Sequence, residues 1–380
     1  MKKKILVVGM LDSIHLARWM SQFVGSDLEF ILFPSKKFRR LHPDLLKIVK
    51  NSGNIKLAVS FVPLKFYGYI DFILLCGSKI QINLNFRSRF LAAKIRANNP
   101  QIVHTLEIQG AGYVCLDALK FIEKDFCLIV TNWGSDIFYY QNFPTHLVRI
   151  KALLAVADAY SAECDRDYLL ASKLGFMGKA LPCIPNGGGF SSMEIDYQYS
   201  VASTRRGIVV KAYGGTFGRG ALTIKVLQNL LKEFPEYSVY LYSVTRDLYS
   251  AVSKLSDLFP GRVRFSILDK GISHDALREI FANSRVYIGC SISDGISTSF
   301  LESLITGAYP IQTNTSCAGE WLTKGAVGSL IPVNELELTK ALKQALESDA
   351  MVNQAQTANR SVSKNYLSKN VISNAALTFY

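Results

Sequence analysis

The sequence has no apolar run long enough to cross a bilayer. Its most apolar long stretch, residues 55–76, is interrupted by a proline, two lysines and Asp71, whereas a spanning helix needs about 20 residues with few or no charges. The apolar run at the start of the chain ends at Gly9, which makes it too short for the apolar core of a signal peptide. We therefore expect neither a membrane-spanning helix nor a secretion signal.

Metal-binding and nucleotide-binding fingerprints are also missing. The seven cysteines form no Cys-x-x-Cys pair and no Cys/His pair with metal spacing, which is typical of small core residues in a reduced cytoplasmic protein. Gly9 is followed by Met-Leu-Asp and not by the rest of a G-x-G-x-x-G motif, and the glycine-rich string 214–220 lacks the Lys-Ser/Thr ending of a P-loop. We expect no metal site, no cofactor and no bound dinucleotide.

Positive charge is plentiful and concentrated in one region. The net charge is +13, and thirteen basic residues against two acidic ones lie between Lys36 and Arg96. A solvated face, an anionic membrane surface and nucleic acid are the alternatives. Aromatic side chains favour the membrane surface, where such residues collect, and those among the charges are Phe61, Phe66, Tyr67, Tyr69 and Phe72. No nucleic-acid-binding motif occurs, so we expect no nucleic acid as partner.

Short apolar runs alternate with helical patterns along the whole chain, which predicts parallel sheets covered on both faces. The expected strands form one series at residues 5–8, 30–33, 102–104, 128–131 and 180–184, and a second at 207–211, 239–242, 263–267, 286–289, 309–312 and 327–331. Residues 185–204 have the composition of a linker. The sequence therefore predicts an α/β protein of two Rossmann-like, doubly wound domains facing a central cleft, over residues 1–190 and 205–360. A helical tail, 361–380, is expected to pack back on the first domain.

The stretch 291–304 is the strongest indication of chemistry. It follows an expected strand and opens a helix, and the small residues around Gly295 allow the backbone to approach a ligand closely. Free amides at a helix start bind anions, so a diphosphate would meet residues 296–299. Glu302 would then accept hydrogen bonds from ribose hydroxyls. The alternative is a capping box, because Ser299-Phe300-Leu301-Glu302 also fits Ser-x-x-Glu.

This stretch resembles the E-x7-E motif of the retaining glycosyltransferases of family 4, with Asp294 and Glu302 as its two acidic residues. Further segments are similar to motifs of the same family: 13–19, Pro100-Gln101-Ile102-Val103-His104, Trp133-Gly134-Ser135-Asp136, 157–159, Ile184-Pro185-Asn186-Gly187, 307–311, Glu320 and 325–328. The resemblance covers nearly the whole chain and implies the GT-B fold.

The resemblance also implies a set of site residues. The catalytic residues would be Asp294, Lys211, Arg219 and His104, with Lys211 and Arg219 neutralising the donor diphosphate. The donor would be bound by Glu302, Gly295, Ser297, Thr298 and Ser299, and the acceptor by Ser13, His15, Asp136 and Gln109.

Five of these residues also have a structural alternative. Arg219 is a solvated helix residue in the simplest interpretation, and His15 and His104 are histidines satisfied by backbone groups. Asp136 is then a helix cap, and Gln109 faces solvent.

We expect a cytoplasmic, metal-independent, retaining glycosyltransferase, peripheral on the inner face of the membrane, with a nucleotide sugar (UDP- or GDP-sugar) as co-substrate. Its acceptor would be a glycan or lipid-linked acceptor in surface polysaccharide biosynthesis. The alternatives are a GT-B nucleotide-sugar epimerase and a catalytically silent nucleotide-sugar-binding membrane scaffold.

Overall fold

The computed structural model describes residues 2–58, 86–269 and 271–380. The chain divides into two compact units, one formed by Met1–Gly188 with Ile372–Tyr380 and the other by Gly189–Val371. Each unit is built on a parallel sheet, so the predicted α/β class with two doubly wound domains is confirmed. Within the described residues, no helix is both long and apolar enough to cross a membrane.

The sheet of the first unit has seven parallel strands in the order β3-β2-β1-β4-β5-β6-β7. They are β1 (Lys4–Gly9), β2 (Glu29–Pro34), β3 (Ile55–Leu57), β4 (Ile102–Leu106), β5 (Cys127–Thr131), β6 (Ala159–Ser161) and β7 (Lys179–Ala180). The strand order reverses between β1 and β4. In open α/β sheets, ligands bind outside the carboxyl ends of the strands at such a reversal.

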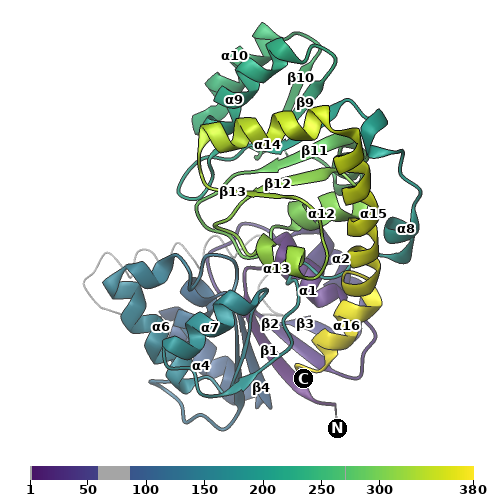
Figure 1. Cartoon of the computed structure of the whole chain (residues 1–380). Helices are drawn as coiled ribbons and strands as arrows, with labels where there is room; N and C mark the ends of the chain where they lie inside the picture. The colour runs from purple at the N-terminus through teal and green to yellow at the C-terminus, as the bar shows by residue number, and fades with distance from the viewer. Residues whose placement is uncertain (1, 59–85, 270) are drawn as a thin grey trace. The chain divides into compact units, whose positions relative to one another are not determined.

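Helices cover both faces of this sheet (Figure 1). They are α1 (Ile14–Ser21), α2 (Pro43–Asn51), α4 (Phe86–Asn98), α5 (Tyr113–Ala118), α6 (Pro144–Val156), α7 (Asp165–Lys173) and α16 (Lys369–Leu377). Side chains alternate along a strand, so Leu6 and Val8 of β1 join one apolar core with α4 to α7. Ile5 and Val7 join the other core with α1, α2 and the end of α16.

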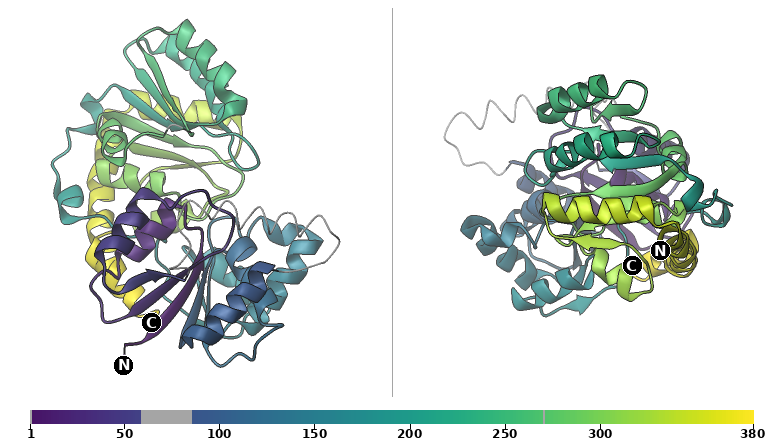
Figure 2. Two further views of the ribbon diagram at one scale, coloured as in Figure 1. Left: turned by 180° about the vertical axis from the view of Figure 1, so that it is seen from behind. Right: turned by 45° about the horizontal axis from the view of Figure 1, so that its top comes forward.

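The last residues of the chain complete this second core. The side chain of Tyr380 packs against Phe23 and Phe30, with ring centroids 5.2 and 5.3 Å away, and its hydroxyl accepts a hydrogen bond from Trp19 Nε1 at 3.2 Å. The Lys3 ammonium donates to the carbonyl oxygen of Tyr380. Figure 2 shows the two chain ends beside each other. The first unit is therefore assembled from both ends of the chain.

The sheet of the second unit has six parallel strands in the order β10-β9-β8-β11-β12-β13. They are β8 (Gly207–Lys211), β9 (Ser238–Val244), β10 (Val263–Ile267), β11 (Ser284–Gly289), β12 (Tyr309–Thr313) and β13 (Ser329–Ile331). Here the order reverses between β8 and β11, which makes their carboxyl ends the expected ligand site of this unit.

The helices of the second unit are α8 (Ser192–Asp196), α9 (Gly220–Glu233), α10 (Tyr249–Leu258), α11 (His274–Ala282), α12 (Thr298–Thr306), α13 (Ala318–Thr323), α14 (Glu335–Glu347) and α15 (Asp349–Tyr366). Helices α9, α10 and α14 lie along one face of the sheet, with α12 and α13 on the other (Figure 1). Ile208 and Val210 of β8 share one core with Leu227 of α9 and Leu342 of α14.

Two of the expected strands are shorter in the structure, and two strands of the structure were not predicted. The run 180–184 leaves the sheet after Ala180, since Pro182 has no amide to donate to a neighbouring strand. In the run 327–331 only Ser329–Ile331 is a strand, because the backbone of Val327 is bonded at both its amide and its carbonyl by the side chain of Asn359. The strands β3 and β6 have three residues each, too few to show an alternating pattern.

Candidate functional site

Lys211, the predicted phosphate-binding cation, lies at the carboxyl end of β8. The strand order of the second sheet reverses at this point, between β8 and β11. Lys211 is the last residue of β8 and pairs in register with Gly289, the last residue of β11. The loops that follow these two strands are joined by backbone contacts. The amide of Arg219 donates to the carbonyl of Cys290 at 3.0 Å, and Gly218 forms an antiparallel bridge with Ser291. The Arg219 and Asp294 segments therefore leave neighbouring strands at the same edge of the sheet.

Glycines set the shape of the loop after β8. A β-carbon on Gly218 would lie 2.1 Å from the carbonyl oxygen of Tyr213, so no other residue fits there without a shift of the backbone. Gly215 has a positive φ of 63°, which L-residues with a side chain rarely adopt. Its amide donates to Asp247 Oδ2 at 3.2 Å. The loop after β8 is thus held in one shape by its glycines and by an acidic side chain.

Arg219 braces the same loop from the start of α9. It is the N-cap residue of this helix, and its Nη1 donates to the carbonyl oxygens of Thr216 at 3.3 Å and Gly218 at 2.7 Å. The side chain is half-buried, so it is more constrained than the solvated helix residue of the alternative interpretation. A guanidinium has five N–H donors in a planar fork, which leaves donors for an anion after these two contacts.

Helix α12 begins beside the Lys211 ammonium. Its N-cap residue, Ser297, makes no side-chain capping bond, so the first amides of the helix receive no partner from it. Lys211 Nζ lies 3.5 Å from Ser297 Oγ, and among the described residues no carboxylate pairs with this ammonium. A cation at the positive end of a helix is unfavourable alone but favourable once an anion binds both.

The alternative of a capping box is wrong, because Ser299 lies inside α12 and is not its N-cap. The neighbouring residues of the predicted donor site are arranged around the helix start. Gly295, Ser297 and Ser299 are buried, and Thr298 is the first, half-buried residue of the helix. The carbonyl of Gly295 accepts a hydrogen bond from the amide of Cys317 at 2.9 Å, which fixes the loop before α12.

Glu302 lies one turn further along α12 and is bound by a residue that the sequence did not indicate. Glu302 is buried, and its Oε1 accepts a hydrogen bond from His274 Nε2 at 2.9 Å. His274 is the first residue of α11 and lies 28 positions earlier in the chain. A single sequence offers no signal for such a contact, because it depends on how two helices pack.

Asp294 lies in the loop between β11 and α12 and is half-buried. Burial raises the pKa of the Tyr213 hydroxyl, and the negative charge of Asp294 raises it further. Tyr213 also follows β8 directly, and its ring lies 5.0 Å from Lys211 Nζ. Asp294, the predicted catalytic carboxylate, and Lys211, the predicted cation, therefore both lie near the side chain of Tyr213.

In the first unit, Ser13 and His15 follow the carboxyl end of β1. Ser13 is the N-cap of α1, and its Oγ accepts a hydrogen bond from the amide of His15 at 3.1 Å. The exposed imidazole of His15 meets the Trp133 ring edge-on at a centroid distance of 5.5 Å. These two of the four predicted acceptor residues thus lie at the reversal of the first sheet, where a ligand is expected.

His104, predicted as catalytic, is fully buried in the structure. Its Nδ1 is 2.6 Å from Tyr380 Oη, and its Nε2 is 2.5 Å from Thr131 Oγ1. Burial lowers the pKa of the imidazole to about 3, so the ring is neutral at physiological pH. Both ring nitrogens are thus occupied within the protein, and His104 ties β4 to β5 and to Tyr380, which favours a structural role over the predicted catalytic one.

Asp136, predicted to bind the acceptor, is also occupied by the protein. Its Oδ2 accepts hydrogen bonds from the amides of Ile108 at 2.8 Å and Trp133 at 3.0 Å, and its carboxylate is buried. Burial, and then the nearby charge of Glu107, raise its pKa well above the usual value. The structure therefore gives Asp136 the role of a clamp between two loops. It caps no α-helix, because residues 134–139 form turns.

Gln109, predicted to bind the acceptor, lies beside this clamp. Its Nε2 donates to the carbonyl of Asp136 at 2.8 Å, and the residue is half-exposed in a π-helical turn, Ile108–Gly112. Glu107 precedes the turn with a φ of 87°, and its carboxylate accepts from the amides of Gly110 and Ala111. Strained residues and π-turns often occur at functional sites. The loop after β4 thus has a defined conformation at the edge of the first sheet where a ligand is expected.

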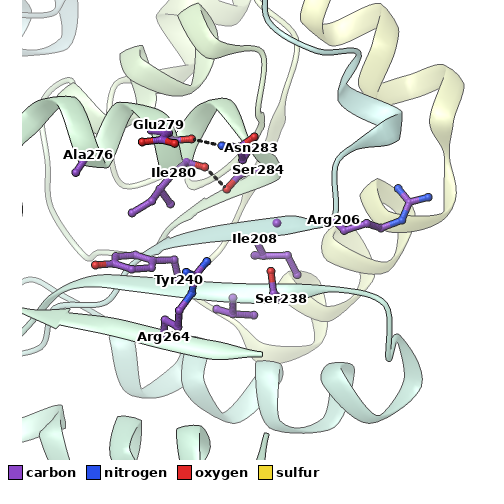
Figure 3. Close-up of a pocket in the computed structure, with 12 residues that line it drawn as sticks. Arg206, Ile208, Ser238, Tyr240, Arg264, Ala276, Glu279, Ile280, Asn283 and Ser284 are labelled. Carbon is purple, nitrogen blue, oxygen red and sulfur yellow. Dashed lines mark hydrogen bonds between the residues drawn. The ribbon is translucent and has the colours of Figure 1, made fainter. Parts of the chain in front are cut away.

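A separate hollow of about 500 Å³ lies at the opposite end of the second sheet (Figure 3). It is lined by the amino-terminal parts of β8, β9 and β10 and by α11, with Arg264 and Glu279 on its walls. Lys211 and the start of α12 are at the carboxyl ends of the strands. This hollow therefore does not belong to the candidate donor site.

Comparison with known proteins supports the fold. No protein family and no curated protein matches by sequence. The structure is similar to that of Anabaena Alr3699/HepE in complex with UDP and glucose, with a TM-score of 0.70, 13% identity and 99% of each chain covered. It is also similar to a sucrose-phosphate synthase from Thermosynechococcus elongatus (TM-score 0.68, 13% identity, 100% of this chain and 98% of that one). It is similar, too, to a glycosyltransferase from Rickettsia africae, with a TM-score of 0.66 and 16% identity over 100% of this chain and 98% of that one.

These similarities show that the chain has the GT-B fold of glycosyltransferases, as predicted. At such low identity they do not distinguish family 4 from other GT-B families.

Proposed function

We propose that the protein is a glycosyltransferase that takes a sugar from a nucleotide-sugar donor bound to its second unit. The observation that carries this proposal is the Lys211 ammonium, 3.5 Å from Ser297 Oγ at the uncapped start of α12. A diphosphate placed there would receive the charge of Lys211, the free donors of Arg219 and the helix amides. The GT-B fold and the UDP and glucose bound by the Anabaena protein support the same ligand class.

In this proposal Asp294 contacts the donor sugar and Glu302 the nucleotide ribose. The reaction retains the configuration of the sugar: the diphosphate leaves, and the acceptor hydroxyl attacks from the same face. Lys211, Arg219 and the amides of residues 298 and 299 stabilise the negative charge that develops on the leaving group, which is usually the largest contribution to such catalysis. We favour UDP over GDP as the nucleotide, and family 4 as the class of enzyme.

Binding of nucleotides and consumption of the donor test the proposal. Calorimetry with UDP and GDP should give binding of one of them to the wild-type protein, and Lys211→Ala should weaken it. Incubation of UDP-glucose and other labelled nucleotide sugars with lipid-linked glycans should consume the donor only when an acceptor is present. Donor conversion without acceptor would favour an epimerase, and binding without turnover would favour a silent binding protein.

Activity should survive a chelator. Lys211 and Arg219 supply the positive charge that a divalent metal would otherwise bring to the diphosphate. We expect turnover in excess EDTA to equal that in magnesium or manganese. Complete loss of turnover in EDTA, restored by either metal, would contradict this mechanism.

We also propose that the basic part of the first unit binds an anionic membrane surface on the cytoplasmic side, where a lipid-linked acceptor would be found. The side chains of Lys36, Lys37, Arg39 and Arg40 are exposed. Helix α4 has no acidic residue and exposes Phe86 and Phe90, by 53% and 39%, next to its basic residues. The aromatic residues 61–72 that first suggested a membrane lie outside the described residues.

Charge reversal should abolish this binding. Each basic residue near an anionic surface contributes about 1 kcal/mol, so changing Lys36, Lys37, Arg39 and Arg40 to Glu should move the protein from the pellet to the supernatant in co-sedimentation with phosphatidylserine vesicles at low salt. The matched control reverses four exposed basic residues of the second unit, namely Lys225, Lys232, Lys254 and Arg264. Equal loss in both variants, or a wild-type protein that stays in the supernatant, would refute a specific membrane face.

A further inference from the structure

The contact between His274 and Glu302 is not part of the sequence motif, yet it involves a carboxylate of the candidate donor site. His274 Nε2 and Glu302 Oε1 are 2.9 Å apart. The side chain of Glu302 is 7% exposed and that of His274 37% exposed. The carboxylate is therefore held inside the protein, while the imidazole beside it is partly exposed.

The ring of His274 is not needed to start its own helix. Ser273 is the N-cap of α11, and its Oγ accepts a hydrogen bond from the amide of Ala276 at 3.2 Å. The imidazole points instead to the neighbouring helix α12. Because a carboxylate only accepts hydrogen bonds, the Nε2 of His274 carries the proton in this contact. The tautomer is thereby fixed by Glu302.

The hydrogen bond gives the two carboxylate oxygens of Glu302 different roles. Oε1 is bound by the imidazole, and among the described residues no side chain is bonded to Oε2. A carboxylate with one oxygen fixed has lost most of its rotational freedom, so its second oxygen presents a defined acceptor direction. Such restriction lowers the entropy cost of binding a hydroxyl. A pair of neighbouring ribose hydroxyls is the group in a nucleotide sugar that a carboxylate acceptor of this kind recognises.

We propose that His274 is a positioning residue that orients Glu302 toward the ribose diol of the bound nucleotide. This inference rests on the proposed function, since it assigns to His274 a part in the same donor site. It predicts that the protein distinguishes a ribonucleotide from a nucleotide without ribose hydroxyls, and that this discrimination depends on the Nε2–H group of His274.

Three variants separate positioning from simple packing. His274→Ala removes the group that donates the hydrogen bond to Glu302. His274→Asn places an amide nitrogen near the position of Nδ1, and His274→Gln places one near the position of Nε2. Calorimetry measures the affinity of each for the nucleoside diphosphate that binds the wild type, UDP or GDP, and for its 2′,3′-dideoxy analogue. Thermal melts confirm that each variant is folded.

We expect the wild type to prefer the ribonucleotide by roughly ten- to a hundredfold, the range of a hydrogen bond to a charged group. The ratio of the affinity for the ribonucleotide to that for the dideoxy analogue should fall close to one in the Ala and Asn variants. It should be restored in the Gln variant. Loss of affinity for both ligands by the same factor, with the preference intact, would show a packing role and overturn this inference alone. Failure of the wild type to bind either UDP or GDP would overturn the proposed function and this inference with it.

Discussion

Arg219→Ala should lower turnover by on the order of a hundredfold or more, the usual loss when one preorganised donor to a developing negative charge is removed. The structure adds a second reason for a large effect. The guanidinium donates to the carbonyl oxygens of Thr216 and Gly218, so its loss frees the glycine-rich loop as well as removing a charge. Steady-state kinetics with saturating donor measures the change.

Two further variants distinguish these two effects. Arg219→Lys keeps the charge but not the planar fork, so an intermediate rate is expected if the bracing of the loop matters. Arg264→Ala removes an exposed arginine at the opposite end of the second sheet and should leave the rate unchanged. A normal rate for Arg219→Ala would mean that the catalytic site lies elsewhere.

Glu302→Gln should weaken donor binding by roughly ten- to a hundredfold, because a hydrogen bond to a charged acceptor is replaced by a weaker neutral one. The substitution keeps the size of the side chain and leaves an oxygen to accept from His274, so the packing of α11 on α12 is preserved. Calorimetric titration with UDP or GDP measures the affinity. A thermal melt close to that of the wild type would show that the loss is not one of folding.

The matched control for this charge is Glu279→Gln. Glu279 is an exposed carboxylate of α11, on the wall of the hollow at the amino-terminal end of the sheet. Its replacement removes the same charge from the same unit and should leave nucleotide affinity as it is. Equal affinity of wild type and Glu302→Gln would assign Glu302 a structural role only.

The fold could be predicted from the sequence because the central strands of both sheets, β1, β4, β8 and β11, are largely buried. β8 has the bounds read from its apolar run, since continuous apolar stretches between turns are typical of parallel sheets. β10 also has its expected bounds, although it is an edge strand with exposed and half-buried residues. The expected strand at 180–184 leaves the sheet because of Pro182. The expected strand at 327–331 is shortened by the side chain of Asn359. Such a side-chain contact is made between residues far apart in the chain, and no local pattern reports it.

The candidate site was only partly visible in the sequence, for the same reason. Lys211 and Ser297 could be named because each ends or follows a strand at the reversal of the sheet. For His104 and Asp136 the residue types suggested chemistry, but burial and the hydrogen bonds to Tyr380, Thr131 and backbone amides were decided by packing. His274 illustrates the opposite case, a residue without a motif that the packing of two helices brings to a carboxylate.

The order in which the first unit receives its parts has a consequence for synthesis on the ribosome. Its aromatic site around Trp19 and Phe23 is filled by Tyr380, but the whole second unit, Gly189–Val371, is translated in between. At about 5–20 residues per second this takes on the order of ten to forty seconds. For that time the nascent first unit lacks Tyr380 in this aromatic site, and the open site is a target for chaperones. A fragment ending at Gly188 will retain that open site permanently.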